Sequence, residues 1–133
     1  MVEINAYSKA KDGGKKLSAN FTVKEFACKD GSDAVLTAPR LVMVLQSIRS
    51  HFAAPVVIHS AYRTPQYNAE VGGAAHSQHC YGTAADISVK GQTPAAVAAY
   101  ARELMPDWGG VGVYAGQGFT HIDVRDLRSD WTG

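Results

Sequence analysis

The chain has 133 residues, of which 46% are hydrophobic, and its 13 Lys and Arg residues nearly balance 12 Asp and Glu residues. This length and hydrophobic content are typical of one compact domain. The balanced charge gives no electrostatic reason to expect nucleic acid or an anionic membrane as a partner. No apolar run approaches the roughly 20 residues needed to span a bilayer. We therefore expect neither a nucleic-acid-binding protein nor a membrane protein.

The first 20 residues are rich in Lys, Gly, Asn and Ser and have little periodic apolar content. They predict a loosely structured N-terminal arm or an edge segment over residues 1–20, followed by a folded domain over residues 21–133. This N-terminus is polar and Lys-rich rather than signal-like, so we expect a cytoplasmic location for the protein as synthesised. The two cysteines, Cys28 and Cys80, are expected to be reduced in that location.

The first periodic segment lies between Thr37 and Phe52. Apolar residues recur there at spacings of three and four, and Pro39 falls in the first turn. This pattern predicts an amphipathic helix with Thr37 as its N-cap. A second such pattern starts at Thr93-Pro94 and ends at Pro106, which predicts a second helix lying on a sheet.

Four other segments are typical of β-strands. Residues 55–59 and 84–89 each predict one strand, and the first of these ends in a loop that carries Arg63 outward. Residues 111–114 and 119–124 are separated by a Gly-rich tetrapeptide, which predicts an antiparallel hairpin. The aromatic residues Trp108 and Trp131 are expected to cover the edge of the core rather than to stack on a sugar.

The alternation of side chains along two predicted strands brings polar residues to shared faces. In the strand over 84–89, Asp86 is the odd polar group beside small residues. In the last strand, His121 and Asp123 lie on the same face. His79 precedes Asp86 by seven residues, and the glycine between them at position 82 permits a close approach of a loop to the strand. These faces could meet at one site.

Two imidazoles and one carboxylate suit zinc, and three protein ligands leave a fourth position for water. Such an open position is typical of a catalytic zinc site rather than a structural one. The alternative is that His79, Asp86 and His121 are ordinary polar residues with local hydrogen bonds, as single histidines more often are. A thiolate ligand from Cys80 is a less favoured variant, because an adjacent His-Cys pair is poor chelating geometry.

Residues 77–86, Ser-Gln-His-Cys-Tyr-Gly-Thr-Ala-Ala-Asp, match the pattern Ser-x-His-x-x-Gly-x-Ala-x-Asp at every fixed position. This pattern resembles that of the zinc D-alanyl-D-alanine carboxypeptidases and the related phage and bacterial murein endopeptidases. Ser-Ala-Tyr-Arg at 60–63 and His-Ile-Asp at 121–123 resemble two further segments of that family. The resemblance covers about residues 20–133, and a pattern of this length followed by a third ligand in order is specific.

The resemblance implies an α+β fold with a small antiparallel sheet and flanking helices, shared with the hedgehog signalling domain. It makes His79, Asp86 and His121 the ligands of one zinc ion, and Arg63 the group that binds the substrate carbonyl or its oxyanion. A guanidinium suits that role because it is always charged and offers forked donors, whereas the alternative is a surface salt bridge. Asp123 is expected either to orient a ligand histidine or to act as the general base.

The segment before His121 departs from the pattern of well-known family members. They carry a carboxylate shortly before the last zinc histidine, whereas this chain has Gln-Gly-Phe-Thr at 117–120. The proton acceptor therefore either comes from elsewhere, with Asp123 and His76 as options, or is absent. Metal binding is thus better supported by the sequence than catalysis.

Two classes of function follow. The resemblance implies a zinc metallopeptidase that hydrolyses peptide bonds of peptidoglycan stem peptides with zinc-activated water, as a carboxypeptidase or an endopeptidase. The alternative is a non-catalytic, zinc-stabilised module of the same fold that binds the cell wall or a protein, as the hedgehog relative shows the fold can do. The resemblance, together with the small size and the N-terminus that is not signal-like, implies a phage-endolysin-like enzyme that acts on the cell wall after release from the cell. No exposed heptad or apolar stripe indicates an oligomer, so a monomer is the default expectation.

Overall fold

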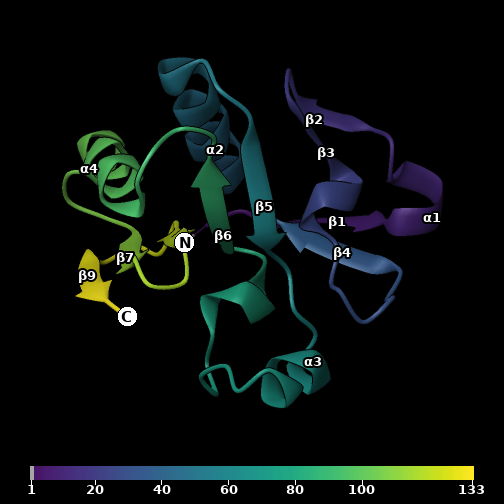
Figure 1. The fold of residues 1–133 in the computed structure, drawn as a ribbon. Coiled ribbons are helices and arrows are strands. Elements are labelled where there is room, and N and C mark those ends of the chain that lie inside the picture. The colour runs from purple at the N-terminus through teal and green to yellow at the C-terminus, as the bar shows by residue number, and fades with distance from the viewer. Residues whose placement is uncertain (1) are drawn as a thin grey trace.

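The computed structural model describes residues 2–133. Its elements, in chain order, are β1 (Asn5–Ser8), α1 (Lys9–Asp12), β2 (Lys16–Ser18), β3 (Phe21–Thr22), η1 (Val23–Phe26), β4 (Ala34–Thr37), α2 (Pro39–Phe52), β5 (Val56–Ser60), α3 (Pro65–Glu70), η2 (Gln78–Tyr81), β6 (Ala84–Val89), α4 (Pro94–Leu104), β7 (Gly110–Tyr114), β8 (Phe119–Asp123) and β9 (Ser129–Thr132), where η marks a 3-10 helix (Figure 1).

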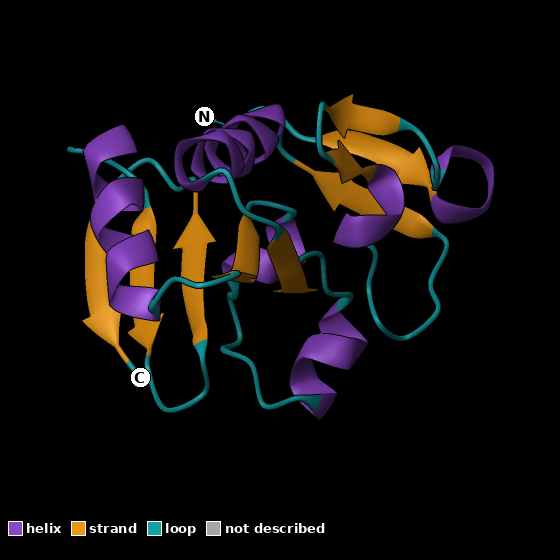
Figure 2. Ribbon diagram, turned by 45° about the horizontal axis from the view of Figure 1, so that its top comes forward, coloured by secondary structure: helices purple, strands orange, loops and turns teal. Residues whose placement is uncertain are grey.

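The strands form one five-stranded sheet, in the order β5-β6-β8-β7-β9, and two small sheets, β1-β4 and β2-β3. Neighbouring strands of the large sheet are antiparallel, except that β7 and β9 are parallel. Figure 2 shows the small sheets on one side of the molecule and the large sheet on the other. This arrangement is the α+β fold that the sequence predicts, with a small antiparallel sheet and flanking helices.

The core lies between the large sheet and two helices. Helices α2 and α4 contact each other and pack against β6. Leu45 and Ile48 of α2 and Ile87 of β6 are among the largest fully buried side chains. Because alternate residues of a strand face opposite ways, burial of Ile87 against the helices leaves Asp86 on the other face of the sheet. The core packing thereby fixes which residues of β6 reach the uncovered face.

Both predicted helices are confirmed, but the start of the first differs from the prediction. Helix α4 begins after Thr93, whose hydroxyl accepts a hydrogen bond from the Ala96 backbone as expected. Helix α2 begins after Ala38, which has no side-chain cap, so Thr37 is not the N-cap. Thr37 instead ends β4, where it lies opposite Asn5 of β1. Its hydroxyl is therefore not used by the helix.

Residues 2–20 contain two strands and a short helix. β1 pairs with β4, and β2 pairs with β3, so both strands join residues that follow position 20. The Ser8 side chain accepts a hydrogen bond from the Lys11 backbone at the start of α1, and Asp33 accepts hydrogen bonds from Ser8 and the Ala10 backbone. These elements are too short for a periodic pattern to reveal them. The division of the chain at residue 20 stays a prediction.

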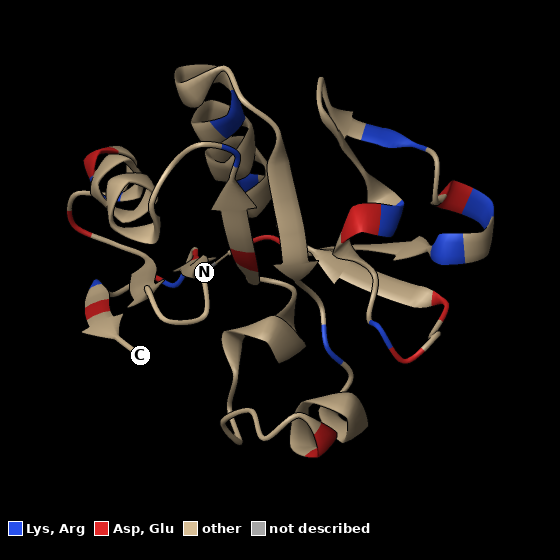
Figure 3. Cartoon of the chain, in the orientation of Figure 1, with Lys and Arg blue, Asp and Glu red and all other residues tan. Residues whose placement is uncertain are grey.

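Basic and acidic residues lie close together along the N-terminal part of the chain (Figure 3). Figure 3 shows Lys and Arg segments beside Asp and Glu segments along the N-terminal elements, in keeping with the balanced composition. Among residues 2–133, no helix is both long enough and apolar enough to cross a bilayer. Cys28 is buried and Cys80 is half-buried, and neither forms a disulfide bond within the described residues.

Candidate metal centre

Three elements bring the predicted metal ligands together. Asp86 of β6 lies directly opposite His121 of β8 in the strand register. His79 comes from η2, the 3-10 helix that precedes β6. Gly82 joins η2 to β6 with a φ of 75°, and a Cβ atom at this position would lie 2.6 Å from the Leu36 carbonyl oxygen. Only glycine adopts this backbone without strain and permits so close an approach, so Gly82 holds His79 at the start of the strand.

The side chains of His79, Asp86 and His121 converge. One ligand atom from each lies within 4.8 Å of the other two. His121 Nδ1 is 3.0 Å from Asp86 Oδ1, and His79 Nε2 is 3.3 Å from Asp86 Oδ2. All three residues are more than nine-tenths buried. The structure therefore brings together the three residues that the sequence singled out, and Cys80 is not part of this cluster.

In each imidazole, the ring nitrogen that does not face Asp86 contacts another group of the protein. His79 Nδ1 lies 2.7 Å from the Ala61 carbonyl oxygen, and His121 Nε2 lies 2.8 Å from Asp123 Oδ2. A carbonyl oxygen only accepts, so His79 Nδ1 carries the proton and leaves the lone pair of neutral His79 on Nε2. Both nitrogens of His121 face carboxylates, so its Nδ1 atom is freed for a cation when Asp123 keeps the proton on Nε2. Two imidazole nitrogens and a carboxylate that face one another fit a divalent cation such as zinc.

The charges of the cluster depend on one another. Burial alone would raise the pKa of Asp86, but hydrogen bonds from His121 and His79 outweigh burial and hold this pKa well below its usual range. Burial alone would lower the pKa of His121, but hydrogen bonds to Asp123 and Asp86 raise it above its ordinary value. Asp86 is therefore a carboxylate, and a cation entering the cluster would displace a proton from His121.

Asp123 is fully enclosed, with 0% of its surface exposed. Besides His121, its carboxylate accepts hydrogen bonds from the Gly110 backbone, from the Arg125 backbone and from two guanidinium nitrogens of Arg125. Burial would raise its pKa, but the hydrogen bonds from Arg125 and His121 lower the pKa below its usual range. A Cβ atom on residue 110 would collide with this carboxylate, so Gly110 makes room for it. These contacts suit a group that orients His121 better than one that accepts a proton from a substrate or water.

Arg63 lies at the edge of the cluster rather than at the outer surface. Its Nη2 atom is 3.6 Å from Asp86 Oδ2, and its side chain is only 16% exposed. Nε donates to the Ser60 hydroxyl at 3.1 Å, and Nη1 donates to Asn68 Oδ1 at 3.2 Å. Asn68, a buried residue of α3, in turn donates to the Ala74 carbonyl oxygen. The sequence predicts a loop here, so helix α3 and the support that Asn68 gives to Arg63 were not expected.

A cleft of about 630 Å³ opens over the cluster, and an aromatic wall borders it. The rings of Tyr114 and Phe119 stack at 4.6 Å, and Trp131 donates from Nε1 to the Tyr114 hydroxyl at 2.8 Å. The Trp131 ring lies 5.0 Å from that of His121. A Cβ atom on Gly112 would lie 2.5 Å from Trp131 Nε1, so this glycine admits the indole. Trp131 therefore lines the cleft and does not merely cover the core edge, whereas Trp108 packs against the core as expected.

Comparison with known proteins points to the same part of the chain. A model of the family described as Peptidase M15 matches residues 17–123. This range contains the cluster, Arg63, Asn68 and Asp123, and it ends at the last residue of β8. A search of curated proteins found no match.

Proposed function

Because the chain belongs to the Peptidase M15 family, we propose that it is a zinc peptidase that hydrolyses peptide bonds in the stem peptides of peptidoglycan. The observation that carries this proposal is the convergence of His79, Asp86 and His121 in a cleft, with the Arg63 guanidinium beside them. A structural metal site is normally closed by a fourth protein ligand. Among residues 2–133, no fourth His, Cys, Asp or Glu joins the cluster.

The chain's own groups have distinct tasks in this proposal. His79 Nε2, His121 Nδ1 and the Asp86 carboxylate would hold the ion, while the Ala61 carbonyl and Asp123 keep the two imidazoles in the required tautomers. When bound, zinc supplies Lewis-acid chemistry: it polarises a carbonyl and makes water more acidic. Arg63 would orient the scissile carbonyl and donate to the oxygen on which charge develops.

The cleft suits a peptide that carries carboxylate groups. Arg63 and Arg125 both line it, and a stem peptide carries carboxylates that such cations attract. The side of the cleft formed by Tyr114, Phe119 and Trp131 offers apolar surface for the peptide's small side chains. Arg63 and Arg125 would therefore bind the carboxylates of the substrate, and the aromatic residues would contact its apolar groups.

His76 is the residue that we propose as proton acceptor. Asp123 is enclosed and already forms five hydrogen bonds, and residues 117–120 contain no acid. His76 is exposed and lines the cleft without belonging to the cluster. Imidazole is the side chain that most often transfers protons near neutral pH. The His76 side chain is thus accessible from the cleft, whereas that of Asp123 is not.

We expect His76→Ala to lower kcat about 100-fold, the usual contribution of a general base, and to leave one zinc ion per chain. The measurement is kcat against pH on a soluble stem peptide, together with metal analysis. His59→Ala is the matched control, since His59 is an exposed histidine that bonds to Ser88 on the sheet and does not line the cleft. A His76→Ala enzyme with the kcat of the unmodified protein would exclude this role.

Asp123→Asn is expected to weaken zinc binding about 10- to 100-fold, as loss of a partner behind a ligand histidine usually does. The amide keeps the size of the side chain but removes the charge that fixes the His121 tautomer. Competition with a chromogenic chelator measures the affinity. Asp107→Asn, at an exposed position, controls for the loss of one negative charge. Equal zinc affinity of the two variants would contradict the orienting role of Asp123.

The decisive test of the proposed function is digestion of purified murein and of cross-linked muropeptides, with and without a chelator, read by mass spectrometry. Release of terminal D-alanine would identify a carboxypeptidase, and conversion of dimers to monomers an endopeptidase.

A second candidate function, a non-catalytic module of the same fold, is favoured by the missing acid at 117–120. Binding of murein without any chelator-sensitive product would establish that function and overturn the peptidase.

A further inference from the structure

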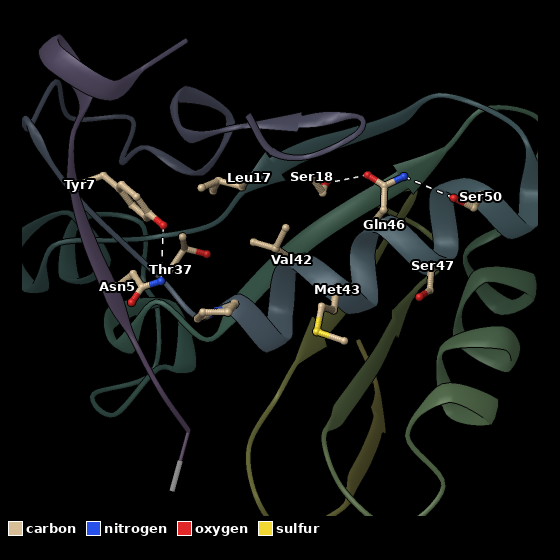
Figure 4. Close-up of a pocket in the computed structure, with 11 residues that line it drawn as sticks. Asn5, Tyr7, Leu17, Ser18, Thr37, Val42, Met43, Gln46, Ser47 and Ser50 are labelled. Carbon is tan, nitrogen blue, oxygen red and sulfur yellow. Dashed lines mark hydrogen bonds between the residues drawn. The ribbon is translucent and has the colours of Figure 1, made fainter. Parts of the chain in front are cut away.

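A second cavity, of about 530 Å³, lies between the N-terminal strands and α2 and shares no lining residue with the metal cleft. Its lining residues come from β1, β2, β4 and α2, as Figure 4 shows. The volume falls in the range of about 300–1,000 Å³ that is usual for small-molecule sites. Nothing in the proposed peptidase chemistry uses this cavity.

Thr37 gives the first sign that the cavity binds something. The residue is only 2% exposed, and its Oγ1 atom has no hydrogen-bond partner among the described residues. In Figure 4 its side chain lies between those of Tyr7 and Val42, on the wall of the cavity. A buried hydroxyl without a partner is unfavourable, and each instance in a native structure needs an explanation. A ligand with its own hydroxyl or amide group would satisfy Oγ1.

The lining indicates the chemistry of that ligand. None of the lining residues is charged. Leu17, Val42 and Met43 supply apolar surface, Met43 being 70% exposed, while Asn5 contributes a carboxamide beside the Tyr7 hydroxyl. Lys15 lies over the Tyr7 ring at 5.5 Å, but it does not line the cavity. An ion or a carboxylate-bearing peptide would find no opposite charge here.

The polar rim is held in place before any ligand arrives. The Gln46 carboxamide accepts a hydrogen bond from the Ser18 hydroxyl at 2.6 Å and donates one to the Ser50 hydroxyl at 3.3 Å, both drawn in Figure 4. The same carboxamide also bonds to Asn20, outside the cavity. This network connects α2 to β2 across the cavity. Pre-ordered polar groups bind more tightly because less entropy is lost on association.

We propose that this cavity binds an uncharged, N-acetylated sugar unit of the glycan strand that carries the stem peptides. A sugar ring offers apolar C–H faces for Val42 and Met43 and hydroxyl or amide groups for Thr37 and the rim, and it carries no charge. The identity of the glycan rests on the proposed function, whereas the neutral and amphipathic character of the site rests on its lining alone. The enzyme would hold the sugar backbone and the peptide at separate places.

The test is a titration of isotopically labelled protein with a tetramer of N-acetylglucosamine, which carries no peptide, followed by amide NMR shifts. We expect shifts at the cavity residues of β1, β2 and α2 and none at the metal cleft. Thr37→Val should weaken binding about tenfold, the value of one hydrogen bond, while the melting temperature stays equal or rises. Thr37→Ser, which keeps the hydroxyl, should bind like the unmodified protein.

Thr120→Val is the matched control, because Thr120 is also buried but its hydroxyl donates to the Pro94 carbonyl oxygen at 2.8 Å. The same chemical change should there lower the melting temperature and leave sugar affinity unchanged. The inference is overturned if the tetramer does not bind, if the shifts fall in the metal cleft, if Thr37→Val binds equally well, or if a sugar-free stem peptide fills the cavity instead. Absence of peptide hydrolysis with intact sugar binding would defeat only the proposed peptidase.

Discussion

His79→Ala is expected to abolish peptide hydrolysis and stoichiometric zinc binding. The substitution leaves only Asp86 and His121 to hold the ion, and zinc sites in enzymes use three protein ligands. His79 is the most informative of the three, because outside the cluster its imidazole bonds only to the Ala61 carbonyl in the described structure. His121→Ala would also leave Asp86 and Asp123 buried beside an empty space, which destabilises a protein by about 3–5 kcal/mol.

The measurement combines metal analysis, hydrolysis of a soluble stem peptide and circular dichroism. His51→Ala is the matched control, since His51 is an exposed histidine of α2 that stacks on Tyr100 away from the cleft. We expect the control to keep both zinc and activity. A folded His79→Ala protein that retains hydrolysis within about tenfold of the unmodified protein would show that the cluster is not the catalytic metal site.

Arg63→Ala is expected to lower kcat about 100- to 1,000-fold, the usual effect of removing one donor to a developing oxyanion. Zinc should stay bound, because Arg63 is not a ligand. Arg63→Lys should recover only part of the loss, since an ammonium keeps the charge but cannot reproduce the fork between Ser60 and Asn68. The measurements are kcat and KM on a soluble stem peptide, with zinc content determined on the same samples.

Arg49→Ala, on α2, controls for the loss of one positive charge away from the cleft. The changes in kcat and KM distinguish two possible roles of Arg63. A fall in kcat places its interaction in the transition state, whereas a rise in KM at constant kcat would mean uniform substrate binding. The second outcome would remove Arg63 from the oxyanion role and leave it as a substrate anchor.

The metal cluster could be predicted from sequence because it depends on strand parity and on a compact motif. Asp86 and His121 lie on strands whose alternation is regular, so their shared face follows once each strand is placed, and the structure pairs them directly. His79 could be identified from the motif over residues 77–86. Helix α2 was also predictable from its apolar spacing, but its first residue was not, since Thr37 and Ala38 are one residue apart and helix boundaries are weakly encoded.

The rest of the cleft depends on contacts that local patterns do not encode. Thr64-Pro65 is the same kind of helix start as Thr93-Pro94, and Thr64 does cap α3. However, α3 is only six residues long, too short for apolar periodicity, so Asn68 was missed. Trp131 reaches the cleft because β9 joins β7 in parallel, a long-range pairing that no local signal reveals.

The course of β9 has a practical consequence for protein production. This strand leads the backbone from Trp131, beside His121, to Gly133, which lies against Tyr114 at the aromatic wall. A polyhistidine segment joined to Gly133 would bring competing imidazoles close to the metal cleft, so metal stoichiometry should be measured on a preparation without such a segment. A tag joined shortly before Asn5 would lie beside the second cavity, which Asn5 lines. Each assay therefore calls for its own purification design.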